Sequence, residues 1–201
     1  MCQQVFFLRH AEVGEPILLG QRYDASLSKE GLRQAHAWAE ALQGIPFQAI
    51  LTSPARRARE TAEVIAGGRA PVLAFPHFLE VAWGEWEGLP REEARLLLRA
   101  QSQKWAEEAW DWAPPGGETL RTVLTRALEG LQLAYSLYPT GNLLIVTHGR
   151  LLQALLCHLL GYPPAAQPRF HHRRGQLTWA VRLPQGLYYL RALAVDAYTP
   201  L

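Results

Sequence analysis

Histidine and arginine residues follow three short apolar segments of this 201-residue chain. Arg9 and His10 follow the first segment directly. Arg57 lies shortly after the second segment, and His148 comes directly after the third. A neutral imidazole can attack phosphorus, while arginine side chains and a cationic histidine neutralise the oxygens of a phosphoryl group. These residue types therefore indicate phosphoryl transfer, a chemistry that they can perform without a metal ion or a cofactor.

The motifs of several other site types are absent from the sequence. It has no H-E-x-x-H zinc motif, no C-x-x-C motif, no Walker loop and no G-x-G-x-x-G turn. The neighbouring His171 and His172 cannot bind one ion as residues four apart on a helix would. Two cysteines, Cys2 and Cys157, are too few for a disulfide framework and predict two reduced thiols. The sequence thus favours neither a metal centre nor a nucleotide-binding loop.

Predicted strands and helices alternate along most of the chain. Alternation of this kind is typical of an α/β fold with a largely parallel sheet. Ser28 and Ser53 are the expected N-caps of the first two helices, the second with Pro54 in its first turn. The strands are expected at residues 5–8, 47–51, 72–75 and 143–147, and the helices at 28–43, 53–66 and 149–160.

The later segments extend this pattern. Two strands are expected at 177–183 and 187–194, and an amphipathic helix covers 118–137. We predict one domain over residues 1–201, built as a three-layer α/β sandwich whose mostly parallel sheet is flanked by helices. In such sheets ligands bind beyond the carboxyl ends of the strands, so the histidines and arginines that follow these strands are expected to meet along one edge.

Two further segments each allow two interpretations. Residues 90–112 form a charged helical stretch whose apolar residues either pack in the core or form a lid around an aromatic or heterocyclic leaving group. The basic residues of 169–174 are either solvated or attract a polyanionic substrate. The residues concerned are Leu98, Trp105, Ala109 and Trp112 in the first segment, and Arg169, His171, His172, Arg173 and Arg174 in the second.

Composition excludes several classes of partner. The 20 Lys and Arg against 18 Asp and Glu leave a net charge of +2, which argues against a non-specific binder of nucleic acid. No apolar run approaches the roughly 20 residues of a membrane-spanning helix, and the beginning of the chain lacks the features of a secretion signal. We therefore expect a cytoplasmic protein that acts on a small molecule, with neither nucleic acid nor membrane as a partner.

Five segments resemble, in order, the signatures of the histidine phosphatase (phosphoglycerate mutase-like) superfamily. They spread over nearly the whole chain. A single Arg-His pair would be weak evidence, but chance does not explain five motifs in this order. The segments are RHAE at 9–12, SPARRARETA at 53–62, EVAWGEWEG at 80–88, PGGE at 115–118 and VTHG at 146–149.

The resemblance implies a role for each matched residue. His10 corresponds to the nucleophile that becomes phosphohistidine, and Glu80 to the proton donor of the leaving group. Arg9, Arg57 and His148 correspond to residues that bind the phosphoryl group. Because attack requires an unprotonated ring nitrogen, we expect the other nitrogen of His10 to donate to a backbone carbonyl. Further candidates for substrate binding are Arg22, Trp83 and Gly149.

The function expected from the resemblance is hydrolysis of a small phosphorylated metabolite through a phosphohistidine, with Glu80 first as acid and then as base for water. The chain is similar to the phosphatase branch, of which α-ribazole phosphatases are one group. A cofactor-dependent phosphoglycerate mutase is one alternative, although residues 89–113 show no arginine pair of the kind that would hold a carboxylate. A non-catalytic phosphate-binding module is the other. The resemblance also leaves a homodimer open.

Overall fold

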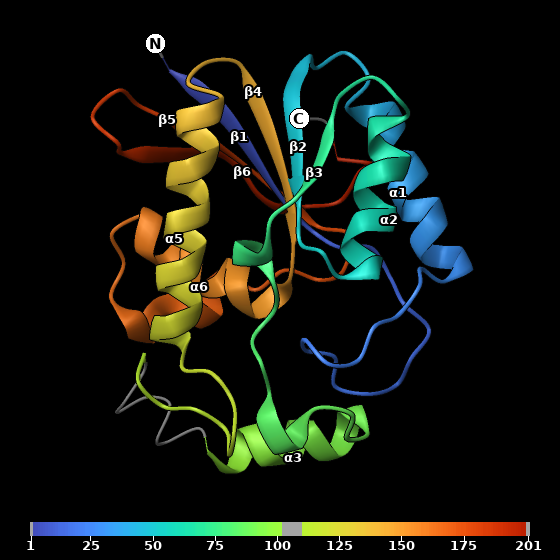
Figure 1. The fold of residues 1–201 in the computed structure, drawn as a ribbon, viewed down its shortest axis with the longest axis vertical. Coiled ribbons are helices and arrows are strands. Elements are labelled where there is room, and N and C mark those ends of the chain that lie inside the picture. The colour runs from blue at the N-terminus through green and yellow to red at the C-terminus, as the bar shows by residue number, and fades with distance from the viewer. Residues whose placement is uncertain (1, 102–109, 200–201) are drawn as a thin grey trace.

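The architecture is built around one six-stranded sheet (Figure 1). The computed structural model describes residues 2–101 and 110–199. The strands are β1 (Gln3–Arg9), β2 (Phe47–Thr52), β3 (Val72–Ala74), β4 (Asn142–Thr147), β5 (Leu177–Arg182) and β6 (Tyr188–Val195). Their order is β3-β2-β4-β1-β5-β6; the first four in this order run parallel, and β5 and β6 add antiparallel pairs at one edge. The predicted α/β fold with a mostly parallel sheet is confirmed.

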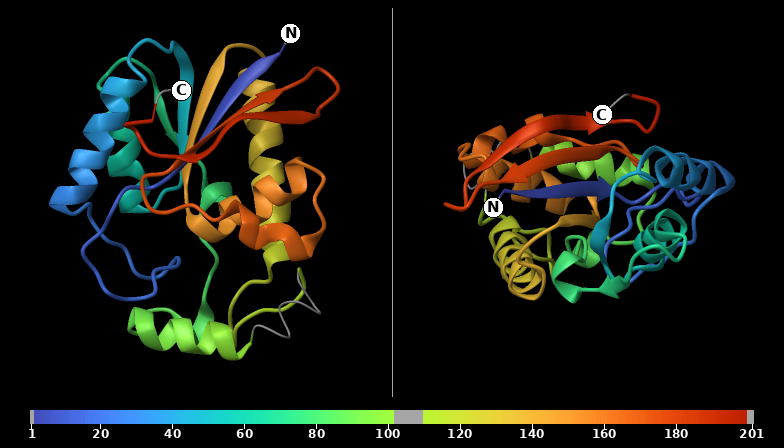
Figure 2. Two further views of the ribbon diagram at one scale, coloured as in Figure 1. Left: turned by 180° about the vertical axis from the view of Figure 1, so that it is seen from behind. Right: turned by 90° about the horizontal axis from the view of Figure 1, so that it is seen from above.

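Helices cover both faces of the sheet, which makes three layers (Figure 2). Successive side chains of a strand point to opposite faces, so β1 buries Phe6 and Leu8 on one face and Val5 and Phe7 on the other. A strand that is covered on both faces has a continuous apolar sequence, as β1 does. The covering helices are α1 (Lys29–Ala41) and α2 (Arg56–Ala66) on the first face, and α5 (Leu120–Leu137) and α6 (Gly149–Leu159) on the second.

The carboxyl ends of β1, β2 and β4 lie level with one another. Arg9 of β1 pairs with Thr147 of β4, and Thr52 of β2 pairs with Val146 of β4. The residues that follow these strand ends therefore lie side by side at one edge of the sheet. They are His10, Ser53 and His148.

A separate helix, α3 (Arg91–Ala100), lies beyond these strand ends and away from the sheet (Figure 1). The helix predicted over 90–112 is shorter among the described residues, because 110–112 are not helical. Trp105 and Ala109 lie outside the described residues. No helix in the described part of the chain combines the length and the apolar character needed to cross a membrane. Short 3₁₀ helices occur at η1 (Pro76–Phe78), η2 (Gly84–Trp86) and η3 (Pro164–Phe170).

The two predicted N-caps have different outcomes. Ser28 caps α1, because its Oγ accepts a hydrogen bond from the N–H of Gly31 at 3.0 Å. The prediction for Ser53 is wrong: Ala55 is the N-cap of α2, and the helix begins later than expected. The Ser53 hydroxyl accepts a hydrogen bond from the N–H of Ala55 at 3.2 Å and lies 2.8 Å from Nε2 of His148, a side chain from a distant strand end.

Candidate active site

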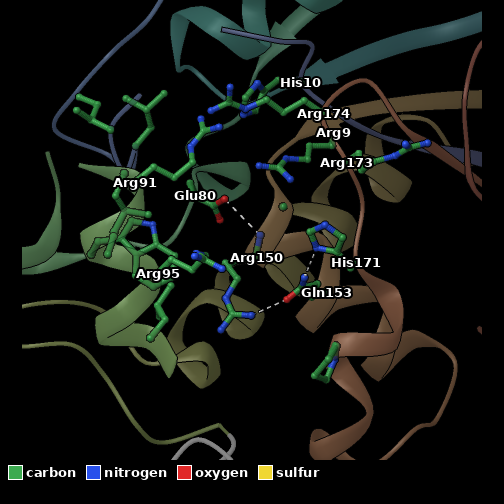
Figure 3. A pocket seen from close by; sticks show the side chains of 18 of the residues that line it. Arg9, His10, Glu80, Arg91, Arg95, Arg150, Gln153, His171, Arg173 and Arg174 are labelled. Carbon is green, nitrogen blue, oxygen red and sulfur yellow. Dashed lines mark hydrogen bonds between the residues drawn. The ribbon is translucent and has the colours of Figure 1, made fainter. Parts of the chain in front are cut away.

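A cavity of about 890 Å³ lies at the carboxyl ends of the parallel strands, between them and α3 (Figure 3). Its described lining comes from the strand ends, from α3 and from the segment around η3. His148 does not line it but lies buried against His10. The cavity brings together six of the predicted site residues, Arg9, His10, Arg57, Glu80, Trp83 and Gly149.

His10 is buried and has one ring nitrogen suited to attack. Its Nδ1 donates to the backbone carbonyl of Ala11 at 2.8 Å, as expected, which leaves Nε2 unprotonated in the neutral ring. Burial lowers the pKa of His10 well below its ordinary value, and the charges of Arg57 and Arg9 lower it further. His10 is therefore neutral at pH 7, which is the state that a nucleophile requires.

Arg57 is buried and Arg9 half-buried, and backbone carbonyls fix the guanidinium group of each. Nη1 of Arg9 donates to the carbonyl of His172 at 2.6 Å, and Nη2 of Arg57 donates to that of Gly20 at 2.8 Å. Burial lowers the pKa of Arg9 to about 10, so that this side chain keeps its charge at neutral pH. Burial also lowers the pKa of Arg57. Two fixed guanidinium groups near a neutral histidine can bind the oxygens of a phosphoryl group.

His148 is a second buried and neutral histidine. Its ring centroid lies 5.2 Å from that of His10. The Ser53 hydroxyl already accepts a hydrogen bond from the N–H of Ala55, so it can donate to Nε2 of His148 and leave the proton on Nδ1. Burial, followed by the charge of Arg57, lowers the pKa of His148 well below its ordinary value. The expectation of a cationic histidine is therefore wrong, since burial among arginines disfavours a further positive charge and the arginines supply it instead.

Glu80 is a buried carboxyl group in the cavity wall, and three backbone N–H groups hold it. Oε1 accepts from Val81 at 3.0 Å and from Leu151 at 3.2 Å. Oε2 accepts from Arg150 at 3.2 Å. Arg150 and Leu151 belong to the first turn of α6, so the helix terminus fixes this carboxyl group in the cavity that His10 also lines. The position suits transfer of a proton to a leaving group.

Arg126 of α5 holds the segment that carries Glu80. Its Nη2 donates to Oε2 of Glu118 at 3.1 Å, and the same oxygen accepts from the N–H of Ala82 at 2.9 Å. The sequence around Arg126 carries no signal for this role, whereas Glu118 stands in the PGGE motif. Nη1 and Nη2 of Arg126 also donate to three backbone carbonyls, those of His77 at 2.9 Å, Leu79 at 2.7 Å and Glu80 at 2.9 Å.

Gly149 and Trp83 both line the cavity, and each contacts a different arginine. A Cβ at Gly149 would lie 2.9 Å from Cζ of Arg9, so any side chain there would push the guanidinium aside. The Trp83 ring lies 5.9 Å from Cζ of Arg150, in a cation–π arrangement. Gly149 is thus explained by the space that Arg9 needs, and Trp83 offers an aromatic surface to the cavity.

Arg22 and Trp112 are not part of the described lining. The Arg22 side chain is 62% exposed and donates to the carbonyl of Gly84. Its position does not support the predicted phosphate contact. Trp112 packs against Trp86 with ring centroids 5.6 Å apart, which favours packing over a lid for this tryptophan.

The arginines of α3 are functional candidates that the motifs do not include. Arg91, Arg95 and Arg99 all line the cavity. Residues 89–113, where no arginine pair for a carboxylate was expected, thus place three arginines in the cavity wall. A spacing of four residues places side chains on one face of a helix, and this spacing is the signal in the sequence that reveals them.

The basic segment that follows η3 is only partly solvated. His172 is fully buried, and its Nε2 lies 2.7 Å from Oγ1 of Thr178 in β5. Arg174 forms an ion pair with Glu12 and lines the cavity together with His171. The solvated-loop interpretation is wrong for His172 and Arg174, because partners from β5 and from the segment after β1 cover them.

Comparison with known proteins agrees with this geometry. The family model of the histidine phosphatase superfamily (branch 1) matches residues 5–193. An adenosylcobalamin/alpha-ribazole phosphatase of Salmonella typhimurium is 28% identical over 197 residues, which cover 94% of this chain and 95% of that protein. A probable phosphoglycerate mutase of Proteus mirabilis is 32% identical over 214 residues, covering 96% of this chain and 97% of that protein. The solved structure of a mycobacterial glucosyl-3-phosphoglycerate phosphatase is 25% identical, with a TM-score of 0.85 over 98% of this chain and 100% of that one. The chain therefore belongs to the histidine phosphatase superfamily.

Proposed function

We propose that this protein hydrolyses phosphomonoesters through a phosphohistidine formed on His10. The observation that carries the proposal is the state of His10, whose neutral ring has an unprotonated Nε2 close to the charges of Arg9 and Arg57. Glu80 lines the same cavity. A nucleophile, fixed cations and a proton donor are the groups that phosphoryl transfer from an ester requires.

In the first step, Nε2 of His10 attacks phosphorus, and the bond between phosphorus and the leaving oxygen breaks. Arg9 and Arg57 neutralise the developing charge on the other phosphoryl oxygens. His148 does not line the cavity, but its buried Nδ1 beside His10 has no hydrogen-bond partner among the described residues, so we assign it as a neutral donor to the phosphoryl group. Glu80 gives its proton to the leaving oxygen, which departs as an alcohol. The phosphoryl group is then on His10, and Glu80 is a carboxylate.

In the second step, Glu80 takes a proton from water, and the water oxygen attacks phosphorus. The bond between phosphorus and Nε2 breaks, which releases inorganic phosphate and returns His10 to its neutral form. Glu80 is protonated again. These steps need no metal ion.

The relatives support a phosphatase that acts on a small phosphorylated compound. Two of the three proteins compared above are phosphatases of small metabolites by name. A cavity of about 890 Å³ is within the range of pockets that bind such molecules. We also infer a cytoplasmic location, because Cys2 and Cys157 are free cysteines. The resemblance to the superfamily is the support for a homodimer.

A phosphoglycerate mutase is the second candidate, and the arginines of α3 favour it. Arg91, Arg95 and Arg99 could hold a substrate carboxylate, and one relative is named a probable mutase. A mutase returns the phosphoryl group from His10 to the substrate, whereas a phosphatase transfers it to water. Release of inorganic phosphate therefore separates the two functions.

The test uses the purified protein with a chelator present and p-nitrophenyl phosphate, α-ribazole phosphate or 3-phosphoglycerate as substrate. We expect phosphate release that disappears in His10→Ala and persists in His36→Ala, which removes an exposed histidine. Conversion of 3-phosphoglycerate to 2-phosphoglycerate without phosphate release would support the mutase. Binding of inorganic phosphate with neither activity would support the non-catalytic module.

A further inference from the structure

The positive charge of the residues that line the cavity exceeds the negative charge of one phosphoryl group. Its described lining contains eight arginines and two glutamates. Within residues 2–101 and 110–199, four of these arginines form ion pairs with carboxylates, while the lining holds six more arginines than glutamates. A phosphoryl group carries about two negative charges at neutral pH. The excess predicts that a second anionic group enters the same cavity.

Arg150 is placed to receive such a group. Its Nη1 donates to Oε1 of Gln153 at 2.7 Å, and Nε2 of Gln153 donates to Nδ1 of His171 at 3.0 Å (Figure 3). All three residues line the cavity. Gln153 thus fixes the direction of the guanidinium group, and His171 fixes Gln153. A guanidinium group held in one direction can bind a carboxylate or a phosphate in a defined geometry.

Arg150 lies next to the proposed proton donor of the leaving group. Its backbone N–H donates to Oε2 of Glu80 at 3.2 Å, and its side chain lies over the ring of Trp83. Burial lowers the pKa of Arg150 to about 9, and an anion in contact with it would favour its charged form. A leaving group that takes its proton from Glu80 would therefore lie in the part of the cavity that Arg150 lines.

We propose that Arg150, held by Gln153 and His171, forms a subsite for a second anionic group on the leaving alcohol. The preferred substrates are then phosphomonoesters whose alcohol carries a carboxylate or a second phosphate. This proposal rests on the proposed function for the direction of the leaving group, and it assigns Arg150 as a residue that determines specificity.

Binding to the His10→Ala variant tests the subsite without turnover. The ligands are ω-carboxyalkyl phosphates and ω-hydroxyalkyl phosphates of increasing chain length, compared at equal length by calorimetry. We expect the carboxylate to tighten binding about 10- to 100-fold at the best length, the effect of one or two charge-assisted hydrogen bonds. A third series that ends in phosphate distinguishes a preference for a second phosphate from a preference for a carboxylate.

Two variants in the same background identify the responsible side chain. Arg150→Met keeps an extended side chain but removes the charge. We expect the ratio of the affinity for an ω-carboxyalkyl phosphate to that for the ω-hydroxyalkyl phosphate of equal length to fall to about one. Gln153→Leu removes the group that orients Arg150 and should lower the ratio in part. The matched control is Arg191→Met. Arg191 belongs to β6 and is outside the described lining of the cavity, and its Cζ lies 4.9 Å from the centroid of the Trp179 ring, so it is also an arginine packed on a tryptophan.

Equal affinity for the two series at every length would overturn the subsite, as would a ratio that Arg150→Met leaves unchanged in a folded protein. If Arg150→Met does not fold, an unchanged ratio in Gln153→Leu has the same meaning. Failure of the proposed function is a separate result. It would appear as no phosphate release from any series by the protein with His10 in place, whatever the binding ratio.

Discussion

The chemistry of His10 is set by its immediate neighbours. Burial and the charges of Arg9 and Arg57 keep the imidazole neutral, and the Ala11 carbonyl keeps its single proton on Nδ1. The same arginines that lower the pKa of His10, the proposed nucleophile, are those proposed to bind the phosphoryl group. Their positions therefore affect both the binding of the substrate and the state of the nucleophile.

We expect Gly149→Ala to weaken the binding of inorganic phosphate about tenfold, because the new Cβ would displace the guanidinium of Arg9. The measurement is the inhibition constant of phosphate in a phosphatase assay, together with KM. Gly44→Ala is the control, since a Cβ at Gly44 meets no atom within 4 Å. Equal inhibition constants in the two variants would show that Arg9 does not bind phosphate.

Short connecting segments carry Glu80, the proposed proton donor, and a long helix holds them in place. The chain between β3 and α3 contains only the 3₁₀ helices η1 and η2, and it has little regular hydrogen bonding of its own. Arg126 of α5 supplies the missing partners by binding three of its carbonyls. A loop that carries a functional side chain commonly depends on a rigid element in this way.

We expect Arg126→Met to lower kcat about 10- to 100-fold for an alkyl phosphate and much less for p-nitrophenyl phosphate. The reason is that p-nitrophenol leaves without a proton, whereas an alcohol requires the correctly placed carboxyl group of Glu80. The control is Arg121→Met on the same helix, where an exposed arginine pairs with Asp111. An equal loss for both substrates would mean that Arg126 acts on stability and not on the position of Glu80.

The sequence predicts most elements because local patterns determine them. Apart from α2 and the helix expected over 90–112, the predicted helices and strands lie within two residues of the observed ones. For α2, the expected cap Ser53 lies two residues before the observed N-cap, Ala55. Its hydroxyl accepts from the N–H of Ala55 and also contacts His148 of another strand end, a partner that no local pattern reports.

In the candidate site, too, some residues can be predicted from local sequence and others depend on contacts that are distant in sequence. Residues that follow strands, such as His10 and His148, can be predicted because parallel strands bring their carboxyl ends together. The role of Arg126 cannot be predicted, because its backbone partners lie 46 to 49 residues away in the chain, a separation over which sequence periodicity gives no information. A four-residue repeat of arginine is visible in the sequence at Arg91, Arg95 and Arg99. Only the position of α3 beside the cavity shows that these arginines line it.

At the scale of the whole molecule, burial of histidines links stability to pH. His10, His148 and His172 lie in the interior, and burial lowers the pKa of each, that of His172 to about 4. A histidine in the unfolded chain titrates near 6.5. Below that pH the unfolded state binds more protons than the folded state, so the free energy of unfolding falls as the pH falls.

We expect the free energy of unfolding to decrease between pH 6.5 and pH 5, with each of these histidines contributing up to about 1.4 kcal/mol per pH unit. Urea denaturation at a series of pH values measures the slope. His172→Gln should flatten the slope more than His36→Gln, which removes one exposed imidazole. A slope that is the same in both variants would contradict the burial of His172 as a neutral ring.

The strand order has a consequence for the synthesis of the protein. Strand β1 is made before the other five strands of this sheet but lies between β4 and β5, and neither neighbour exists until most of these 201 residues have been made. The apolar residues Val5 to Leu8 therefore lack their final strand partners at the time when α1 and α2 have already been synthesised. A nascent chain with such an unpaired apolar segment is prone to association. On refolding of the whole protein, helical structure is expected to return before phosphatase activity, because pairing of strands so distant in sequence is slow.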